Sequence, residues 1–334
     1  MIISRTPYRL SLFGGGTDYP KWYLKHGGAV IGTAIDKYCN ISVRRLPPFF
    51  EHRYRIVWSK IELVNDLLEI DHPAVRAILL DMKERRGLEI HHDGDLPARS
   101  GLGSSSSFTV GLLNALHAMR GRMVSKDELA RDALRIEQDV IREPVGSQDQ
   151  VWAAYGGLNR IDFERDGSFS VTPLILGRER RDELEGSLML FFTGLSRFAM
   201  TMAKKQIANM DAKERNLHRM REMVDEAQAI ITSPRRPMLE LGTLLLEAWR
   251  LKRELAEGVS TPEIDAIHDA GIAAGAVGGK LLGAGGGGFM AFVVPPEKRQ
   301  AVREKLGHLI EVEIRINAPG SRIVVYEPDD AFKD

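Results

Sequence analysis

The chain has 334 residues, of which 43% are hydrophobic and 28% charged, a composition typical of folded proteins and a length sufficient for two domains. Its 46 Lys and Arg residues equal its 46 Asp and Glu residues, which argues against general recruitment of nucleic acid or anionic membranes. One cysteine, Cys39, excludes an intramolecular disulfide, and no apolar run fits a signal peptide or a membrane span. We therefore expect a cytoplasmic protein without nucleic-acid or membrane partners.

The first 100 residues are predicted to be rich in β-strands. Residues 2–13 alternate in the manner of a strand and end at the sequence GGGTDYP. Further strands are predicted over 27–45, 54–59 and 88–97. A helix is predicted over 71–87, where a glycine would end it.

The next segment is predicted to contain two helices. The first, over 105–120, carries an apolar stripe and ends at a glycine. Ser125 and Glu128 form a capping box for the second helix, which must end before Pro144. The sequence EPVGSQDQ then indicates an irregular turn, and GLNRIDFE indicates a strand.

A polar stretch over 165–187 marks the expected domain boundary, which predicts one domain over 1–175 and another over 176–334. The second domain is expected to hold a strand, two or three long helices, a helix with Pro262 at its first position, and a closing α/β piece. The strand and the long helices are predicted over 188–194, 197–230 and 238–257.

Three glycine-rich loops separate these elements: GGGTDYP, SGLGSSSS and GAGGGG. One such loop is usually a turn, but three together favour phosphate ligands, because small residues let backbone N–H groups approach an oxyanion closely. The loop over 283–288 follows a helix and precedes a strand, which is the reverse of a dinucleotide-binding fold. SGLGSSSS lacks the acidic strand end which that fold needs, and Lys280 lacks the upstream glycine of a P-loop. These tests exclude both nucleotide-binding folds.

The helix over 105–120 begins inside the serine run. Its unpaired N–H groups and the positive end of its dipole therefore face the glycine turn. The serine hydroxyls can either cap the helix or bind the Mg²⁺ of a nucleotide, and different serines can do both.

Together the three loops resemble the motifs of the GHMP kinases, a superfamily that includes galactokinase, homoserine kinase and mevalonate kinase. The matching sequences are RTPYRLSLFGGGTDY, LPARSGLGSSSS and KLLGAGGGGF, in the usual order, and the resemblance covers nearly the whole chain. It implies an α+β fold of two domains, with a β-rich N-terminal domain, an α/β C-terminal domain and the active site in the cleft between them. It also implies an ATP-dependent kinase that uses Mg²⁺.

Within the superfamily, the motifs are most similar to those of the sugar 1-kinases. Galactokinases have a Glu–His pair where this chain has Gly15 and Gly16. A carboxylate there would repel a phosphorylated sugar, whereas the two glycines would leave space and free N–H donors. The resemblance therefore implies phosphorylation of the anomeric C1 hydroxyl of a heptose 7-phosphate.

The resemblance also implies roles for single residues. Asp149 matches the proposed base for the anomeric hydroxyl, and Arg9 matches the arginine that pairs with this aspartate. Taken alone, Asp149 fits a turn residue equally well, and Arg9 fits a surface position on a strand. Asp18 matches the aspartate that accepts hydrogen bonds from the sugar hydroxyls. The implied substrate-binding set is Asp18, Gly15, Gly16, Tyr19 and Arg197.

Ser105 and Glu137 are the implied ligands of Mg²⁺, which prefers oxygen ligands, although Glu137 also fits a solvated helix position. Arg99 stands where many members have glycine, and it either contacts an ATP phosphate or points to solvent. The implied nucleotide-binding residues are Arg99, Ser100, Gly101, Leu102, Gly103, Ser104, Ser105, Ser106, Gly285, Gly286 and Gly287.

Two parts of the site stay open at this point. Arg197, Lys21, Arg44 and Arg45 are candidates for holding the 7-phosphate because cations suit phosphate, but each also fits a surface charge. Trp58 either stacks on the adenine or belongs to the core.

Two other functions also remain open. The same chemistry on fucose or galactose is one, and a non-catalytic sensor of sugar and ATP is the other. Arg9, Glu137 and Asp149 argue against a sensor, which has no need of a catalytic base. The expected partners are a small-molecule sugar phosphate and ATP, and a homodimer is compatible with the sequence.

Overall fold

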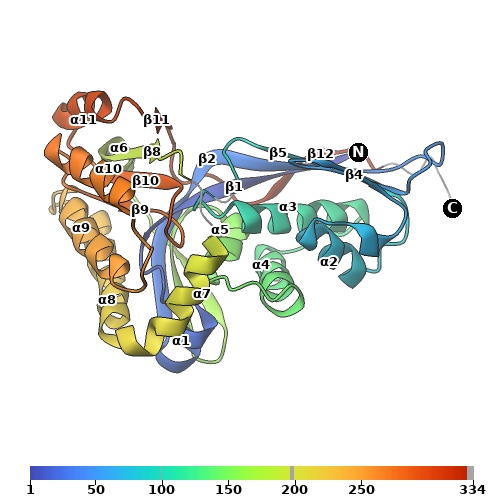
Figure 1. The fold of residues 1–334 in the computed structure, drawn as a ribbon, viewed down its shortest axis with the longest axis horizontal. Coiled ribbons are helices and arrows are strands. Elements are labelled where there is room, and N and C mark those ends of the chain that lie inside the picture. Colours follow the sequence, from blue (N-terminus) through green and yellow to red (C-terminus); the bar gives the residue numbers. More distant parts are fainter. Residues whose placement is uncertain (99, 196–198, 329–334) are drawn as a thin grey trace.

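Two β-sheets organise the protein in a computed structural model that describes residues 1–98, 100–195 and 199–328 (Figure 1). The larger sheet has eight strands in the order β12-β1-β2-β5-β3-β4, with β6 paired to β2 and β7 paired to β6. All of these pairs are antiparallel except β3 with β5. The strands are β1 (Ile2–Phe13), β2 (Gly28–Arg45), β3 (Tyr54–Val57), β4 (Ile61–Val64), β5 (Leu88–Gly94), β6 (Leu158–Phe163), β7 (Phe169–Pro173) and β12 (Arg322–Tyr326).

The smaller sheet has four antiparallel strands in the order β11-β8-β10-β9. They are β8 (Leu188–Phe192), β9 (Gly278–Leu281), β10 (Phe289–Val293) and β11 (Ile310–Glu311). A separate apolar cluster lies beside this sheet and includes Phe191, Trp249 and Phe292, all almost fully buried. The second half of the chain thus has a core of its own in addition to the main one.

Helices from the first half cover one face of the larger sheet (Figure 1). They are α2 (Pro73–Asp81), α3 (Ser104–Met119), α4 (Lys126–Leu134) with its π-helical continuation (Arg135–Val140), and α5 (Gln148–Tyr155). The short helix α1 (Pro20–His26) follows the first glycine-rich loop. The second half adds α6 (Arg178–Ser187), α7 (Ala199–Asn209), α8 (Glu214–Thr232), α9 (Glu240–Arg253), α10 (Pro262–Ala273) and α11 (Arg299–Lys305).

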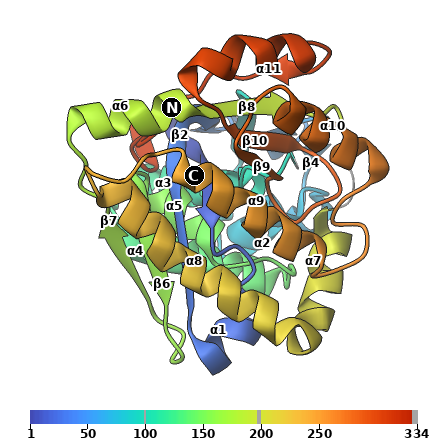
Figure 2. The same cartoon turned by 90° about the vertical axis from the view of Figure 1, so that its left-hand side faces the viewer.

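The two halves share one large apolar core. Helices α8 and α9 lie side by side and contact β1, so residues such as Phe13, Leu217 and Val224 belong to a single cluster (Figure 2). The last strand, β12, returns to pair with β1. A division after residue 175 therefore separates the two sheets except for β12.

The fold confirms the α+β class and most of the predicted elements, but it also differs from the sequence expectations, and α1 and β4 are elements that were not expected. The helix predicted over 71–87 ends at Asp81, and the turn predicted after Pro144 contains α5. Helix α1 was not predicted because it has only seven residues and follows a glycine-rich turn. The polar stretch over 165–187 holds β7 and α6. These elements are stabilised by packing: Val151 and Trp152 of α5, for example, are fully buried.

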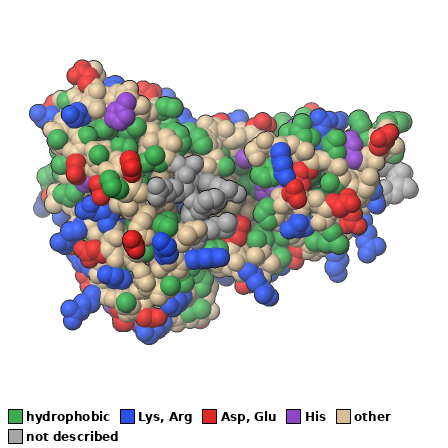
Figure 3. Space-filling model, viewed as in Figure 1, with side chains coloured by type: hydrophobic (Ala, Val, Ile, Leu, Met, Phe, Trp, Pro, Cys, Tyr) green, Lys and Arg blue, Asp and Glu red, His purple; other side chains and the backbone are tan. Residues whose placement is uncertain are grey.

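The surface agrees with the balanced composition. Lys and Arg side chains stand among Asp and Glu side chains on the face shown in Figure 3. Among the described helices, none combines the length and the apolar character that crossing a bilayer requires.

Candidate functional site

Arg9 and Asp149 form the central ion pair of the candidate site. Arg9 is a buried residue of β1, and Asp149 lies in the first turn of α5. Arg9 Nε donates to Asp149 Oδ1 over 2.6 Å and Nη2 donates to Oδ2 over 2.9 Å. This bidentate geometry holds the carboxylate in one orientation. The pairing implied by the resemblance is thus present in the structure.

The same arginine also holds the second glycine-rich loop. Arg9 Nη1 donates to the carbonyl oxygen of Gly101 over 2.6 Å, and the backbone N–H of Arg9 donates to the carbonyl oxygen of Leu102 over 3.1 Å. The carboxylate of Asp149 lies 3.4 Å from the position that a Cβ would take on Gly103. The expected phosphate loop and the expected base are therefore direct neighbours.

Asp18 is a buried carboxylate held by neutral donors. Its Oδ1 accepts from the N–H of Gly16 over 2.8 Å, and its Oδ2 accepts from Gln148 Nε2 over 2.9 Å. Burial raises the pKa of Asp18, the charge of Asp149 raises it further, and the two hydrogen bonds oppose these effects. The N–H of Gly16 is thereby occupied, which corrects the expectation that it is a free donor. Gly15 does leave space, because an added Cβ would have only ordinary contacts, the nearest at 3.6 Å.

The second and third glycine-rich loops pack backbone against backbone. Gly101 has φ +85°, and a Cβ there would lie 2.5 Å from the carbonyl oxygen of Leu282. A Cβ on Gly283 would lie 2.5 Å from the Cα of Gly101. The N–H of Phe289 also donates to the carbonyl oxygen of Ser100 over 3.1 Å. Only glycine permits this approach, which joins two motifs that are 180 residues apart in the sequence.

The remaining glycines of the third loop lie against other parts of the second half. A Cβ on Gly285 would meet the backbone of Val259 at 2.8 Å, and one on Gly287 would meet that of Leu195 at 2.4 Å. The N–H of Gly286 donates to the carbonyl oxygen of Val259 over 3.1 Å. These three glycines therefore shape the loop through backbone contacts with its own half of the chain.

Two buried lysines donate hydrogen bonds to backbone carbonyl oxygens of the first strand and of the third glycine-rich loop. Lys280 Nζ donates to the carbonyl oxygen of Leu12 over 2.6 Å. Lys252 Nζ donates to the carbonyl oxygens of Leu281, over 3.0 Å, and Gly283. Burial lowers the pKa of Lys252 to about 7 and lowers that of Lys280 well below its usual value. Lys252 stands between Leu251 and Arg253, and Lys280 between Gly279 and Leu281, so neither lysine has flanking residues that predict its burial.

Glu137 forms a second acidic centre beside the serine run. The π-helical turn places its side chain, which is 1% exposed, where Ser106 Oγ donates to Oε2 over 2.9 Å. Gln150 Nε2 also donates to Oε2. Burial raises the pKa of Glu137 to about 7, against the hydrogen bonds from its neutral neighbours. The alternative of a solvated helix glutamate does not fit this position.

The surroundings of Glu137 are suited to a hard cation. Its Oε1 has no hydrogen-bond partner among the described residues, although it is buried. Carboxylate, hydroxyl and amide oxygens are the ligands that Mg²⁺ prefers. Ser106 is the serine on this carboxylate, whereas Ser105 is exposed. The N-cap of α3 is Gly103, which has no side chain, so no serine hydroxyl occupies the N-cap position itself.

Unpartnered polar atoms mark the rest of the site. Within the described part of the chain, Ser11 Oγ, Ser100 Oγ and Gln148 Oε1 are buried without a hydrogen-bond partner. Ser11 lies beside Gly15, Ser100 is in the second loop, and Gln148 holds Asp18. Orphaned buried polar groups are rare in folded proteins, so their gathering here points to a polar ligand.

Several candidates from the sequence lie elsewhere. Arg44 and Arg45 pair with Glu89 and Glu84, next to the end of β1 that is opposite the first glycine-rich loop. Because a strand rises about 3.3 Å per residue, the 12-residue β1 puts them tens of ångströms from that loop. Trp58 is not among them: it donates from Nε1 to Glu62, and its ring meets that of His72, which stacks on Phe108 of α3.

Tyr19 and Lys21 remain near the first loop. Tyr19 is buried at the N-cap of α1, and burial raises the pKa of its hydroxyl. Lys21 Nζ forms an ion pair with Asp211 over 3.0 Å and donates to the carbonyl oxygen of Ile207. Its charge is thus engaged at the junction with the second half. Arg99 and Arg197 lie outside the described residues.

The chain matches two family descriptions in the expected order. Residues 70–157 match the GHMP kinases N terminal domain, and residues 214–310 match the GHMP kinases C terminal domain. The chain is also 31% identical over 324 residues to the D-glycero-alpha-D-manno-heptose 7-phosphate kinase of Campylobacter jejuni, covering 92% of this chain and 95% of that protein. The chain therefore belongs to the GHMP kinase family and is an ATP-dependent sugar kinase, close to the heptose phosphate kinases.

Two further relatives narrow the comparison. The crystal structure of a D-glycero-D-manno-heptose 1-phosphate kinase from Bacteroides thetaiotaomicron aligns with a TM-score of 0.79 and 25% identity, covering 98% of this chain and all of that one. The L-fucokinase/L-fucose-1-P guanylyltransferase of Bacteroides fragilis is 26% identical over 96% of this chain but only 37% of its own length. The names of the two heptose kinases place the phosphate at different carbons.

Proposed function

We propose that the chain transfers the γ-phosphate of ATP to the C1 hydroxyl of D-glycero-D-manno-heptose 7-phosphate, giving the 1,7-bisphosphate for the biosynthesis of nucleotide-activated heptose. The observation that carries this proposal is the bidentate Arg9–Asp149 pair, which also binds the carbonyl oxygen of Gly101. A base and a phosphate loop held by one guanidinium are the parts that phosphoryl transfer to a hydroxyl requires.

Asp149 takes the proton in this proposal. The oxygen of the C1 hydroxyl attacks the γ-phosphorus, the bond from phosphorus to the β–γ bridging oxygen breaks, ADP leaves, and the hydroxyl proton passes to the Asp149 carboxylate. Arg9 holds that carboxylate in one orientation and places a positive charge beside the loop that would receive the nucleotide. Asp18 accepts hydrogen bonds from the sugar and fixes its orientation.

The second loop and Glu137 serve the nucleotide. We assign the phosphates to the turn over 100–106 at the N-terminus of α3, where backbone N–H groups and the helix dipole favour anions. Glu137 and the serines Ser105 and Ser106 would hold Mg²⁺, which supplies charge neutralisation of the phosphates when bound. The division into domains over 1–175 and 176–334 is part of the same proposal, with the third loop supplied by the second domain.

The choice of sugar rests on Gly15. Its Cβ position is open, so the chain has room at the place where galactokinases carry a glutamate. The names of the heptose kinases support a heptose phosphate, and the fucokinase relative supports fucose as the second candidate. A glutamate at Gly15 would place a negative charge next to Gln148 and Ser11.

A panel of acceptors separates these possibilities. Release of ADP is measured with D-glycero-D-manno-heptose 7-phosphate, the unphosphorylated heptose, galactose and fucose, and ³¹P NMR identifies the phosphorylated carbon. We expect kcat/KM to be at least about a hundredfold higher for the heptose 7-phosphate, because the loss of one charge-assisted contact to phosphate costs about 1.5–3 kcal/mol and the site would make several. If galactose or fucose were turned over as well as the heptose 7-phosphate, the proposed substrate would be wrong. If no sugar were turned over, the result would support a sensor.

A matched variant tests the role of Gly15. Gly15→Glu is expected to lower kcat/KM for the heptose 7-phosphate by at least about tenfold through charge repulsion, and to change that for galactose much less. Gly15→Gln has nearly the same size without the charge and serves as the control. An equal loss in both variants would mean that space, not charge, sets the selectivity.

A further inference from the structure

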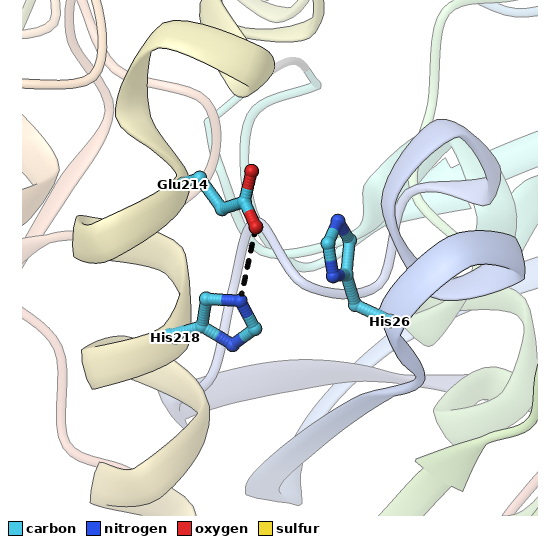
Figure 4. Close-up of side chains that lie close together, drawn as sticks. All are labelled: His26, Glu214 and His218. Carbon is cyan, nitrogen blue, oxygen red and sulfur yellow. Dashed lines mark ion pairs between the residues drawn. The ribbon is translucent and has the colours of Figure 1, made fainter.

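Two histidines and a glutamate meet where α1 contacts the start of α8. His26 is the last residue of α1, Glu214 is the first residue of α8, and His218 follows one turn later on α8. One potential ligand atom from each of the three lies within 4.8 Å of the others, and His218 Nε2 is 3.5 Å from Glu214 Oε1. Figure 4 shows the His26 ring facing Glu214 and His218 from the neighbouring helix. No part of the proposed kinase mechanism uses these side chains.

Trp22 orients both imidazoles. The His26 ring stacks on it at a centroid distance of 4.1 Å, and the His218 ring meets it edge-on at 5.0 Å. Trp22 is 3% exposed, so it forms an apolar wall behind the two rings. The rings themselves stand at 89° to each other. Rings that are already oriented, with an apolar wall behind them, lose less entropy on binding a ligand.

We propose that His26, Glu214 and His218 bind one transition-metal dication, and that Zn²⁺ is the ion that suits them best. Two imidazole nitrogens and one carboxylate oxygen are common ligands of Zn²⁺ in proteins, with water completing four-fold coordination. Zinc–ligand bonds of about 2.0–2.1 Å require ligand atoms about 3.3 Å apart, so the side chains must close by about 1.5 Å at most. All three are at least partly exposed, which permits this rotation.

The ion would tie the first glycine-rich loop to the second half of the chain. Helix α1 directly follows Asp18 and Tyr19, while α8 packs on the loop through Val224 and Leu217, which approach the Cβ positions of Gly14 and Gly16 at 2.7 and 3.2 Å. A bridge between α1 and α8 would therefore stabilise the segment that holds the sugar-binding carboxylate. This site differs in chemistry from the one at Glu137, which offers oxygen ligands to a hard cation.

Zinc binding to the full chain tests the proposal directly. The protein is stripped with EDTA, and its thermal unfolding is followed with added ZnCl₂ or MgCl₂, together with Zn²⁺ affinity by competition with a chromophoric chelator. We expect Zn²⁺ to raise the Tm through this site, whereas any rise caused by Mg²⁺, which would bind at Glu137, should be the same in the original chain and in variants of the three cluster residues. His26→Ala, Glu214→Gln and His218→Ala should each lower the affinity for Zn²⁺ at least about tenfold and reduce the rise in Tm.

Two controls separate this site from other zinc ligands. His308→Ala removes an exposed histidine outside the cluster and should leave the affinity unchanged. Glu137→Gln removes the other candidate cation site and should also leave it unchanged. Co²⁺ gives a second readout, because four-coordinate Co²⁺ absorbs visible light and the absorption should vanish in His218→Ala. The proposal is wrong if Zn²⁺ does not raise the Tm of the unsubstituted chain, or if the three cluster variants bind it with unchanged affinity.

Discussion

The surroundings of Asp149 and of Glu137 show two different ways of holding a carboxylate in the candidate site. Asp149 is paired with a guanidinium of the chain itself, and its side chain remains 25% exposed. Glu137 is 1% exposed, accepts hydrogen bonds from neutral groups only, and has one oxygen without a partner in the described residues. The chain thus supplies a positive charge to Asp149, through Arg9. At Glu137 a positive charge would have to come from a bound cation. This difference fits the proposed roles of Asp149 as the base and of Glu137 as a cation ligand.

The largest effect is expected from Asp149→Asn, which removes the carboxylate of the ion pair with Arg9. The amide keeps the size of the side chain but cannot accept the proton of the C1 hydroxyl, so kcat should fall by about 10²–10⁴. The affinity for ATP should stay near that of the original chain, because Arg9 still binds the carbonyl oxygen of Gly101. Steady-state kinetics and nucleotide binding measure the two quantities. Asp139→Asn, an exposed carboxylate, is the control; an unchanged kcat in Asp149→Asn would remove this residue as the base.

Glu137→Gln is the corresponding change at the candidate cation site, and it should affect the Mg²⁺ requirement more than kcat. The amide cannot offer a charged oxygen to a cation, so the Mg²⁺ concentration for half-maximal activity should rise at least about tenfold. At saturating Mg²⁺ the loss in kcat should be smaller than in Asp149→Asn. Activity titrated with Mg²⁺ at fixed ATP distinguishes the variants. If Asp149→Asn and Glu137→Gln changed kcat and the Mg²⁺ requirement in the same way, the two carboxylates would not have the different roles proposed.

The pH dependence of stability is the third test of this contrast. Burial raises the pKa of Glu137 to about 7 from an unfolded value near 4.5, so folding favours its protonated form. The group stabilises the fold fully below about pH 4.5, and this contribution is lost as the pH rises through about 7. Without Mg²⁺, the free energy of unfolding should therefore fall from pH 5 to pH 8 by roughly 2–3 kcal/mol more in the original chain than in Glu137→Gln.

Urea unfolding in EDTA at several pH values measures this difference. Added Mg²⁺ should restore the lost stability of the original chain at pH 8, because a bound cation favours the ionised carboxylate. A pH profile that is the same in both proteins would show that Glu137 ionises as easily in the folded state as in the unfolded state.

Local patterns predicted the long elements of this fold well. Strand β1 appears over the predicted residues, and α3 begins within the predicted serine run. Short helices were missed where packing outweighs propensity. Helix α5, which carries Asp149, is an example. The sequence EPVGSQDQ indicates a turn, but packing of α3 and α4 against α5 stabilises the helix.

The sequence predicted three glycine-rich loops as the site. The contacts between these loops cannot be predicted from the periodicity of the sequence. Gly101 and Gly283 are suited to close approach, but nothing local indicates that they approach each other. Gln148 and Lys252 are ordinary polar residues in the sequence, and only the fold puts them on Asp18 and on the third loop. The π-helical turn that buries Glu137 has no known sequence signal in this segment. The cluster of His26 and His218 depends on the same kind of long-range contact.

The smallest predicted effect distinguishes two neighbouring serines. The resemblance implies Ser105 as the Mg²⁺ ligand, whereas the structure places the hydroxyl of Ser106 on Glu137. If the cation lies at this carboxylate, Ser106→Ala should raise the Mg²⁺ requirement roughly tenfold, the value of one hydrogen bond to a charged group. Ser105→Ala should change it by less than about threefold. The reverse order, measured by the same Mg²⁺ titration, would place the cation further out, at the exposed start of α3 where the nucleotide phosphates are expected.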